Sequence, residues 1–243
     1  MRSVGKPGVA QRESLKNLTA PVIESGHAVS VTTLDLFVVG DPPGLDRAFT
    51  TAKRAPLDQT SWVELVPAWL RGSDELLDLL VAAVPWKQHH RKLFDQVFLE
   101  PRMTAQYKSL REVPHRALSD AAAALSDHYG VEYDNLWLNL YRTGRDSTGW
   151  HRDRFSCRRP ECIVPVLTLG AARRFQLKPR AGGASLTFEP HSGDLVVMGG
   201  RCQEDWVHCV PKADPGIEVR VSVNFQSSEQ AAPRVTTERA PKR

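Results

Sequence analysis

The chain has 243 residues, a formal net charge of +4 and a hydrophobic content of 41%. This length fits one large domain, and this composition supports a globular core and excludes a wholly disordered chain. No apolar run approaches the roughly 18 residues that a membrane helix requires. The charged first residues are not followed by the apolar stretch of a secretory signal. We therefore expect a cytoplasmic, monomeric protein that has no membrane segment.

Both ends of the chain are polar and contain proline and lysine. Segments of this composition bury too little apolar surface to offset the entropy lost on ordering, so we predict disordered tails over residues 1–20 and 227–243. The segment between them, residues 21–226, is predicted to form a single domain.

Helical signals lie in the first half of the chain. Ser73 is predicted to cap a helix over Asp74–Val84, which has acidic residues in its first turn and apolar residues at helical spacing. A second helix is predicted from about Ser119 to His128, ending before Gly130. Trp62–Leu70 is predicted to be a strand that leads into a short turn.

After Asp134 the pattern changes to short strands separated by glycine and proline turns. The predicted strands are Leu136–Tyr141, Ile163–Leu169, Arg173–Leu177, Ser185–Phe188, Asp194–Met198 and Val219–Gln226. Such a series is typical of a double-sheet jelly roll. We predict a mostly β fold of the α+β class: a double-stranded β-helix (jelly roll) over residues 136–226, preceded by an N-terminal α/β extension over residues 21–135 with helices packed outside the barrel.

Two of these strands alternate between apolar and polar residues. The first carries leucines on one face and Trp137, Asn139 and Tyr141 on the other. The last carries three valines and a phenylalanine on one face, and Arg220, Ser222, Asn224 and Gln226 on the other. A polar face can point to solvent or into a ligand cavity. Residues of metal-ligand type lie between the two strands in sequence, which favours the cavity.

The residues of metal-ligand type are His151, Asp153 and, further along the chain, His208. Two imidazoles and one carboxylate form the facial triad that holds Fe(II) and leaves positions open for oxygen and a cosubstrate. His151 and Asp153 are two residues apart, so they share a face in an extended segment. Arg220 follows on a strand and suits the far carboxylate of a dicarboxylic cosubstrate, because its planar fork grips a carboxylate with two hydrogen bonds. This set predicts an Fe(II)- and 2-oxoglutarate-dependent oxygenase.

A wider set of motifs resembles one family. It comprises Asn139-Leu-Tyr141, His151-Arg-Asp153, His208, Arg220-Val-Ser-Val-Asn-Phe225, the tract Gly193–Gly200 and the upstream segment Glu100-Pro-Arg-Met-Thr-Ala-Gln-Tyr107. Together they resemble the AlkB family of nucleic-acid dealkylating dioxygenases over about Trp62 to Gln226. In that family the upstream segment belongs to a nucleotide-recognition lid.

The resemblance implies oxidative dealkylation of bases in DNA or RNA, a DNA-repair activity that uses Fe(II), 2-oxoglutarate and O2. It implies His151, Asp153 and His208 as the catalytic metal ligands. The implied cosubstrate-binding residues are Asn139, Tyr141, Arg220, Ser222, Asn224 and Gln226. The target base would be flipped into the pocket and stacked on aromatic or imidazole groups. The residues expected to contact the nucleic acid are Arg102, Tyr107, Trp150, Arg152, Arg158 and Arg159, although a tryptophan beside a metal ligand is about as often plain packing.

The chain departs from the family at two positions. Gln226 stands where family members usually have a second arginine for 2-oxoglutarate, so cosubstrate affinity is weaker or another arginine substitutes. Phe155 stands where some members have an acid that reads the base, so base preference cannot be carried over from the family. A hydrophobic residue at that position can stack on the base or simply pack.

Positive charge is concentrated around the expected site. Eight arginines and three acidic residues lie between Arg142 and Arg174. A polyanionic substrate would favour this concentration, and a solvated basic surface explains it equally well.

The four cysteines are Cys157, Cys162, Cys202 and Cys209. For a cytosolic chain we expect free thiols and not disulfides. A zinc site that uses Cys157 and Cys162 is the alternative, although their spacing is at the wide end for a zinc-binding pair. His89, His90 and His115 lie in polar stretches and are expected to be exposed.

Two other functions are compatible with these residues. One keeps the oxygenase chemistry but acts on a small molecule or a protein side chain; the lid-like segment and the arginines argue against it. The other is a non-catalytic nucleic-acid-binding relative. Gln226 is the sole support for it, and the intact triad opposes it.

Overall fold

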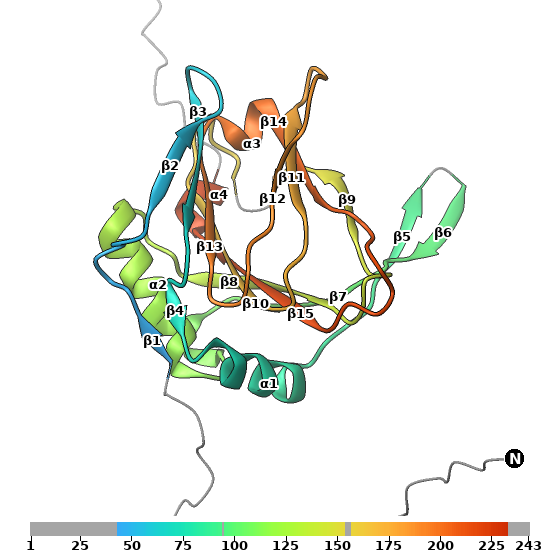
Figure 1. The fold of residues 1–243 in the computed structure, drawn as a ribbon, viewed down its shortest axis with the longest axis horizontal. Coiled ribbons are helices and arrows are strands. Elements are labelled where there is room, and N and C mark those ends of the chain that lie inside the picture. Colours follow the sequence, from blue (N-terminus) through green and yellow to red (C-terminus); the bar gives the residue numbers. More distant parts are fainter. Residues whose placement is uncertain (1–42, 94, 154–156, 233–243) are drawn as a thin grey trace, which may run out of the picture. The chain divides into compact units, whose positions relative to one another are not determined.

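The computed structural model describes residues 43–93, 95–153 and 157–232. The predicted tail over residues 1–20 and Phe155 lie outside this part. Within it, the strands form two facing antiparallel sheets, and two helices lie against the larger one (Figure 1). None of the helices in the described ranges is long and apolar enough to cross a membrane.

The larger sheet has seven strands in the order β2-β3-β13-β10-β15-β8-β7. Their bounds are β2 Lys53–Pro56, β3 Ser61–Val66, β7 Met103–Tyr107, β8 Asn135–Tyr141, β10 Val164–Gly170, β13 Leu195–Gly200 and β15 Arg220–Gln226. The smaller sheet has the order β12-β11-β14-β9, with β9 Thr148–His151, β11 Phe175–Pro179, β12 Leu186–Phe188 and β14 Trp206–Val210. Strands from the second half of the chain thus alternate between two sheets, and the predicted jelly-roll architecture is confirmed.

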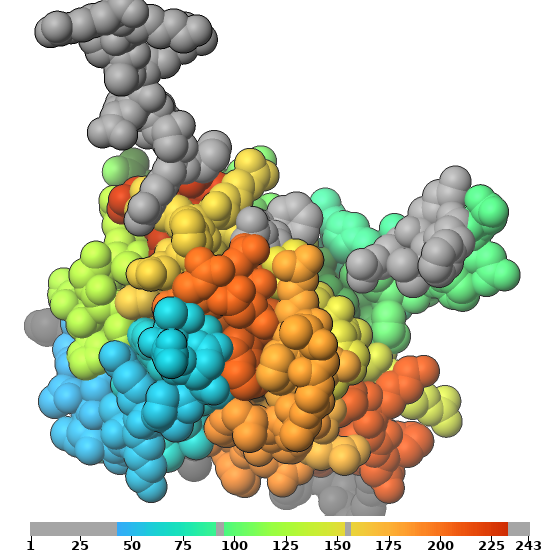
Figure 2. Space-filling model, turned by 90° about the horizontal axis from the view of Figure 1, so that it is seen from above, coloured from blue at the N-terminus to red at the C-terminus, as the bar shows by residue number. Residues whose placement is uncertain are grey.

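Two short pairings lie outside these sheets. Strand β1 (Gly44–Leu45) pairs with β4 (Leu70–Arg71). Strands β5 (His90–Leu93) and β6 (Gln96–Leu99) form a hairpin that projects from the rest of the fold (Figures 1 and 2). The hairpin directly precedes β7.

The larger sheet is apolar on both faces, and each face serves a different core. On β10, Leu167 and Leu169 point toward the helices, while Val164 and Val166 belong to the cluster between the two sheets. This second cluster also contains Phe175 and Leu177 of the smaller sheet. The central strands read as continuous apolar runs because they are covered on both sides.

Helices α1 (Ser73–Ala83) and α2 (Arg116–Tyr129) cover the outer face of the larger sheet (Figure 1). The predicted first helix agrees to within a residue, although the residue before it is Gly72 in a left-handed conformation (φ 64°), and no side chain caps it. Gly130 ends α2 with φ 65°, as expected for a C-cap glycine.

The predicted start of the second helix at Ser119 was wrong by one turn. Helix α2 begins at Arg116, and the ring nitrogen Nδ1 of half-buried His115 accepts a hydrogen bond from the Ala117 amide at 3.1 Å. Histidine is not among the usual N-cap residues, so the sequence favoured the later serine and aspartate.

The predicted C-terminal tail also began too early. Ser227 is fully buried and caps a short helix, α4 (Ser228–Ala231). Gln230 binds the backbone of Ile163 in both directions, at 2.7 Å through its Oε1 and 3.0 Å through its Nε2. These polar side chains are ordered by hydrogen bonds and not by apolar burial, which composition alone cannot reveal. Residues beyond 232 lie outside the described part.

Two cysteines are paired, contrary to the expectation of free thiols. Cys157 and Cys162 form a disulfide that closes the loop after the metal-ligand segment. The loop brings their Cα atoms to 5.9 Å, within the range that a disulfide spans and that sequence spacing does not show. Cys202 and Cys209 are free, as predicted, and both are buried. Helix α3 (Cys202–Asp205) joins β13 to β14.

Candidate active site

His151, Asp153 and His208 meet at one point of the smaller sheet. His151 ends β9, and His208 lies directly opposite it on the adjacent strand β14. The His151 Nε2 atom lies 3.5 Å from Asp153 Oδ1, and the His208 Nε2 atom lies 3.4 Å from Asp153 Oδ2. One donor atom from each residue lies within 4.8 Å of the others. These distances suit three ligands of one ion with bonds of roughly 2 Å.

The ring of His151 is oriented for ligation. Its Nδ1 atom lies 2.8 Å from the carbonyl oxygen of Gly149, which fixes the proton on Nδ1 and leaves the Nε2 lone pair toward Asp153. Asp153 is held through its backbone, because its amide donates to Oε1 of Gln203 at 2.7 Å. Gln203 is 1% exposed and lies on α3. The carboxylate itself is therefore free to ligate.

Burial and mutual charge set the protonation of the triad. Burial lowers the pKa of His208 well below its ordinary value, so the imidazole is neutral and its lone pair available. Burial opposes ionisation of Asp153, but its electrostatic interactions with His208 and His151 outweigh burial and lower the pKa of Asp153 to about 2, so the carboxylate is ionised. The pKa of His151 is raised, because its contacts with Asp153 outweigh burial, so a metal ion would displace a proton from this ring on binding. Two imidazoles and a carboxylate are the donor set of a facial Fe(II) site.

A buried atom without a partner supports the presence of a metal there. Asp153 Oδ2 is buried and has no hydrogen-bond partner among the described residues. Leaving a buried carboxylate oxygen unpaired is costly unless a cation binds it. The residues therefore fit a divalent metal ion.

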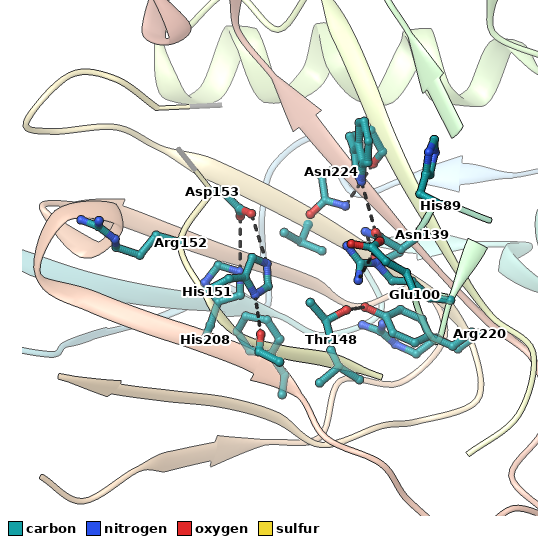
Figure 3. A pocket seen from close by; sticks show the side chains of 18 of the residues that line it. His89, Glu100, Asn139, Thr148, His151, Arg152, Asp153, His208, Arg220 and Asn224 are labelled. Atoms are coloured by element: carbon teal, nitrogen blue, oxygen red, sulfur yellow. Dashed lines mark hydrogen bonds and ion pairs between the residues drawn. The ribbon is translucent and has the colours of Figure 1, made fainter. Parts of the chain in front are cut away.

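The triad opens into a cavity of about 630 Å³ between the two sheets. Figure 3 shows the triad on one side of this cavity and Arg220 and Asn139 on the other. The polar faces predicted for β8 and β15 line it: Trp137, Asn139, Tyr141, Arg220, Ser222, Asn224 and Gln226. A cavity of this size accommodates a small cosubstrate and one base-sized group.

Arg220 is buried at the end of the cavity away from solvent. It is 1% exposed, and its Nη2 atom donates to Thr168 Oγ1 at 3.1 Å. Its Nε and Nη1 atoms are buried and have no partner in the described structure. Burial lowers the pKa of Arg220, yet a guanidinium remains charged at neutral pH. Two unpaired donors of one guanidinium are a place for a carboxylate, so the site fits a dicarboxylate cosubstrate such as 2-oxoglutarate.

Polar contacts order the remaining cosubstrate wall. Asn139 Nδ2 donates to Ser222 Oγ at 3.1 Å, and Asn139 Oδ1 accepts from Arg102 Nε at 2.9 Å and from Trp137 Nε1 at 3.2 Å. The hydroxyls of Tyr141 and Thr148 lie 2.8 Å apart. This network joins the end of β7 to β8 and β15 and fixes the side chains that face the cavity.

The residues predicted to contact nucleic acid divide into two groups. Arg102 and Arg152 line the cavity. Tyr107 does not: it packs in the core beneath β7 and is 9% exposed, because the outward neighbour on that strand, Gln106, takes the cavity face. Trp150 is 41% exposed, with the Lys178 ammonium 4.3 Å from its ring centroid. It lies beside the site and not in the cavity wall.

The arginine cluster is not one continuous basic surface. Arg158 is exposed, but Arg159 forms an ion pair with Glu229 at 2.9 Å. Arg142 binds Asp146 at 2.8 Å, and Arg173 is 1% exposed and donates to backbone carbonyls. Several of these arginines therefore stabilise the fold, and sequence proximity overstated the charge available to a ligand.

The sequence did not reveal several residues at the site. Glu100 lines the cavity, and its carboxylate lies 3.6 Å from Arg102 Nη1. His89 and His90 stand exposed at the cavity edge, at the base of the β5–β6 hairpin. Gln203 supports Asp153 from α3. Glu100 is adjacent to the Pro-Arg motif and could have been found there, whereas the role of Gln203 depends on a tertiary contact without a sequence signal.

Comparison with known proteins agrees with this geometry. Residues 99–239 match the family model of the 2OG-Fe(II) oxygenase superfamily, and the chain belongs to that superfamily. Its relatives include the alpha-ketoglutarate-dependent dioxygenase alkB homolog 3 of Homo sapiens, 29% identical over 178 residues that cover 65% of this chain and 62% of the relative. The DNA oxidative demethylase ALKBH2 of Arabidopsis thaliana is 24% identical over 190 residues, 61% of this chain and 60% of the relative.

Within the superfamily the chain is a member of the AlkB family, as its motifs predicted. It matches about three fifths of the length of these relatives. Among solved structures, a 2OG-Fe(II) oxygenase family oxidoreductase from Burkholderia pseudomallei aligns with a TM-score of 0.45 and 17% identity, over 66% of this chain and 81% of that chain.

Proposed function

We propose that this protein is an Fe(II)- and 2-oxoglutarate-dependent dioxygenase that removes alkyl groups from bases in DNA or RNA. One observation carries the proposal. A facial triad with an unpaired carboxylate oxygen and a buried arginine with two unpaired donors lie on opposite sides of a single cavity. A metal ion would pair the free carboxylate oxygen, and a carboxylate would pair the free arginine donors. A site that takes both is suited to this cosubstrate chemistry.

Each group at the site has a defined task in this reaction. With the metal, 2-oxoglutarate and O2 bound, the chemistry supplied is hydroxylation of the alkyl carbon by one oxygen atom, while the other enters succinate and CO2 is lost. Arg220 and Tyr141 orient the cosubstrate, and the network through Asn139 and Ser222 keeps that wall rigid. The hydroxylated alkyl group then leaves the base nitrogen as an aldehyde, and the nitrogen recovers a proton.

The nucleic-acid substrate is supported by the shape and rim of the cavity. The cavity holds one base-sized group and not a duplex, so a base must leave the stack to reach the triad. Beside the entrance, β6 exposes Val97, Phe98 and Leu99, which are 63%, 47% and 50% exposed. Exposed apolar and aromatic side chains next to histidines suit unstacked bases better than a small polar metabolite. The names of the relatives, a dioxygenase and a DNA oxidative demethylase, point the same way.

The test is a turnover assay that measures succinate and aldehyde. The protein with Fe(II), 2-oxoglutarate and O2 is given matched oligonucleotides, single- and double-stranded, with and without N-alkylated bases. The proposal expects succinate and aldehyde in equal amounts, and only with the alkylated oligonucleotides. Succinate production stimulated by small amines or peptides and not by oligonucleotides would favour the small-molecule or protein oxygenase. Oligonucleotide binding without any succinate would favour the non-catalytic relative.

We also propose that the enzyme acts as a cytoplasmic monomer. All proposed metal and cosubstrate ligands come from one chain and converge without a partner. Light scattering of the purified protein, with a mass of 27.1 kDa expected for the monomer, checks the first part. Cell fractionation checks the second.

A further inference from the structure

The cosubstrate of the proposed reaction carries a carboxylate at each end, and Arg220 accounts for one of them. The strand that supplies Arg220 offers no second cation, because it ends in the neutral Gln226. Asp153 adds a negative charge at the metal end of the cavity. Because Asp153 offsets part of the charge that the metal would supply, a second cationic side chain facing the cavity would strengthen binding of the other carboxylate.

Three arginines line the cavity among the described residues: Arg102, Arg152 and Arg220. Arg152 points away from the triad, with its Nη1 atom 3.3 Å from the Glu204 carbonyl oxygen and 3.9 Å from the Glu204 carboxylate (Figure 3). Arg220 is held at Thr168 beneath the Tyr141 ring, with its guanidinium carbon 5.2 Å from the ring centroid. Arg102 is the arginine that remains for the second carboxylate.

Arg102 is placed deep in the cavity and held there. Its side chain is 15% exposed, its Nε atom donates to Asn139 Oδ1 at 2.9 Å, and its Nη1 atom lies 3.6 Å from Glu100. Asn139 in turn donates to Ser222 on the strand of Arg220. Two anchors on one guanidinium restrict its rotamers, so little entropy is lost when it binds a ligand.

Through its hydrogen bond to Asn139, Arg102 lies across the cavity from the triad, close enough for its positive charge to act on His151 and Asp153. A nucleic-acid phosphate would be a poor partner for Arg102, because the backbone of a flipped nucleotide stays at the surface, whereas the Arg102 side chain is 15% exposed.

We propose that Arg102 is the second cosubstrate-binding arginine and holds the carboxylate next to the keto group, while Arg220 holds the distal carboxylate. The inference rests on the proposed function. It changes the role assigned to Arg102 from contacting the nucleic acid to binding the cosubstrate. The segment predicted as a nucleotide-recognition lid then also supplies a cosubstrate ligand, which replaces the charge absent at Gln226.

The test measures binding without turnover. Protein loaded with Mn(II) is titrated by calorimetry in the absence of O2 with 2-oxoglutarate and with 2-oxovalerate, which lacks the distal carboxylate. Arg102→Gln is expected to raise the Kd for both ligands by about 10- to 100-fold, the loss for hydrogen bonds to a charged group. Arg220→Lys is expected to raise the Kd for 2-oxoglutarate alone. Lys108→Gln, which removes one positive charge from the exposed residue after β7, is the control and should leave both values within about twofold.

A second variant keeps the inference testable if Arg102→Gln loses stability. Gln226→Arg is expected to tighten 2-oxoglutarate binding more in the Arg102→Gln background than in the parent, because it returns a missing charge. Equal tightening in both backgrounds, or an unchanged 2-oxoglutarate Kd in a folded Arg102→Gln protein, would overturn the inference. A parent protein that binds Mn(II) but neither ligand would instead contradict the proposed function itself.

Discussion

The floor of the cavity and the hairpin at its edge differ in how they are built. The floor is made of the paired strands β8 and β15, and its side chains are buried and joined by hydrogen bonds. The β5–β6 hairpin pairs only with itself in the described structure and projects from the fold (Figure 2). Its strand β6 exposes apolar side chains. Cosubstrate binding, which needs fixed geometry, uses the floor, while contacts that must adapt to a large partner use the hairpin.

The metal site should show the largest effect, because all the chemistry depends on it. Asp153→Ala removes the carboxylate ligand and is expected to reduce succinate production to background while the thermal unfolding temperature stays close to that of the parent. Asp78 is exposed on helix α1, so Asp78→Ala is the control and should retain full turnover. Substantial turnover by Asp153→Ala would rule out the assigned triad.

The second-largest effect is expected for Arg220, at the cosubstrate end of the cavity floor. Arg220→Lys keeps the charge but loses the planar fork, so the KM for 2-oxoglutarate is expected to rise about 10- to 100-fold. Steady-state kinetics at saturating oligonucleotide measure it, and Arg71→Lys on the exposed end of β4 is the control. An unchanged KM would remove Arg220 from the cosubstrate site.

A smaller effect is expected for Gln203, which supports the metal ligand Asp153 only through its backbone. Gln203→Ala removes the acceptor for the Asp153 amide, and loss of such outer contacts typically weakens metal binding by 10- to 100-fold, with the lower end expected here. Competition with a fluorescent chelator measures the metal Kd. Gln203→Glu retains an acceptor oxygen and should restore most of the affinity; failure of that rescue would mean that Gln203 acts only through packing.

Substitutions in the hairpin should weaken nucleic-acid binding and leave cosubstrate binding unchanged. Phe98→Ala is expected to weaken binding of a single-stranded alkylated oligonucleotide by about 5- to 20-fold if a base stacks on the ring, with the 2-oxoglutarate Kd unchanged. Fluorescence anisotropy measures the first and calorimetry the second. A change in the cosubstrate Kd would break the separation between floor and hairpin.

The arginines after the triad should show the smallest effect. Arg158→Ala is expected to reduce the slope of log K against log salt by about 0.7 if the side chain neutralises one phosphate of a single strand. Arg159→Ala is expected to change it less, because Glu229 already pairs with this guanidinium. Identical slopes in all three proteins would indicate that these arginines serve solubility.

The sequence predicted correctly which side chains of the floor face the cavity, but it placed the residues around the cavity edge poorly. Strict alternation on β8 and β15 reports directly which side chains share a face, so Asn139, Tyr141 and Arg220 could be placed before any coordinates. Tyr107 could not, since a motif gives residue types without telling which face of β7 each takes. Strand β14, which carries His208, was not predicted, because five residues with one histidine carry too little pattern.

Three further errors have a common origin. The cap at His115, the Cys157–Cys162 bond and the α4 contacts all depend on which segments meet after folding. Local composition treats these residues as polar or unpaired. Prediction of chemistry was easier than prediction of boundaries, because a metal site requires a small set of residue types and a boundary does not.

The contacts of α4 determine where a shortened version of the protein can end without disturbing the site. The natural stopping point suggested by the sequence is Gln226, where the last strand ends. A chain ended there would lose Gln230, whose carbonyl accepts from the Arg158 amide and whose side chain binds Ile163. Those contacts pin both ends of the disulfide-closed loop that follows Asp153. Shortening the protein to its barrel would therefore loosen the segment next to the metal, and a low-activity truncated preparation would say little about the native enzyme.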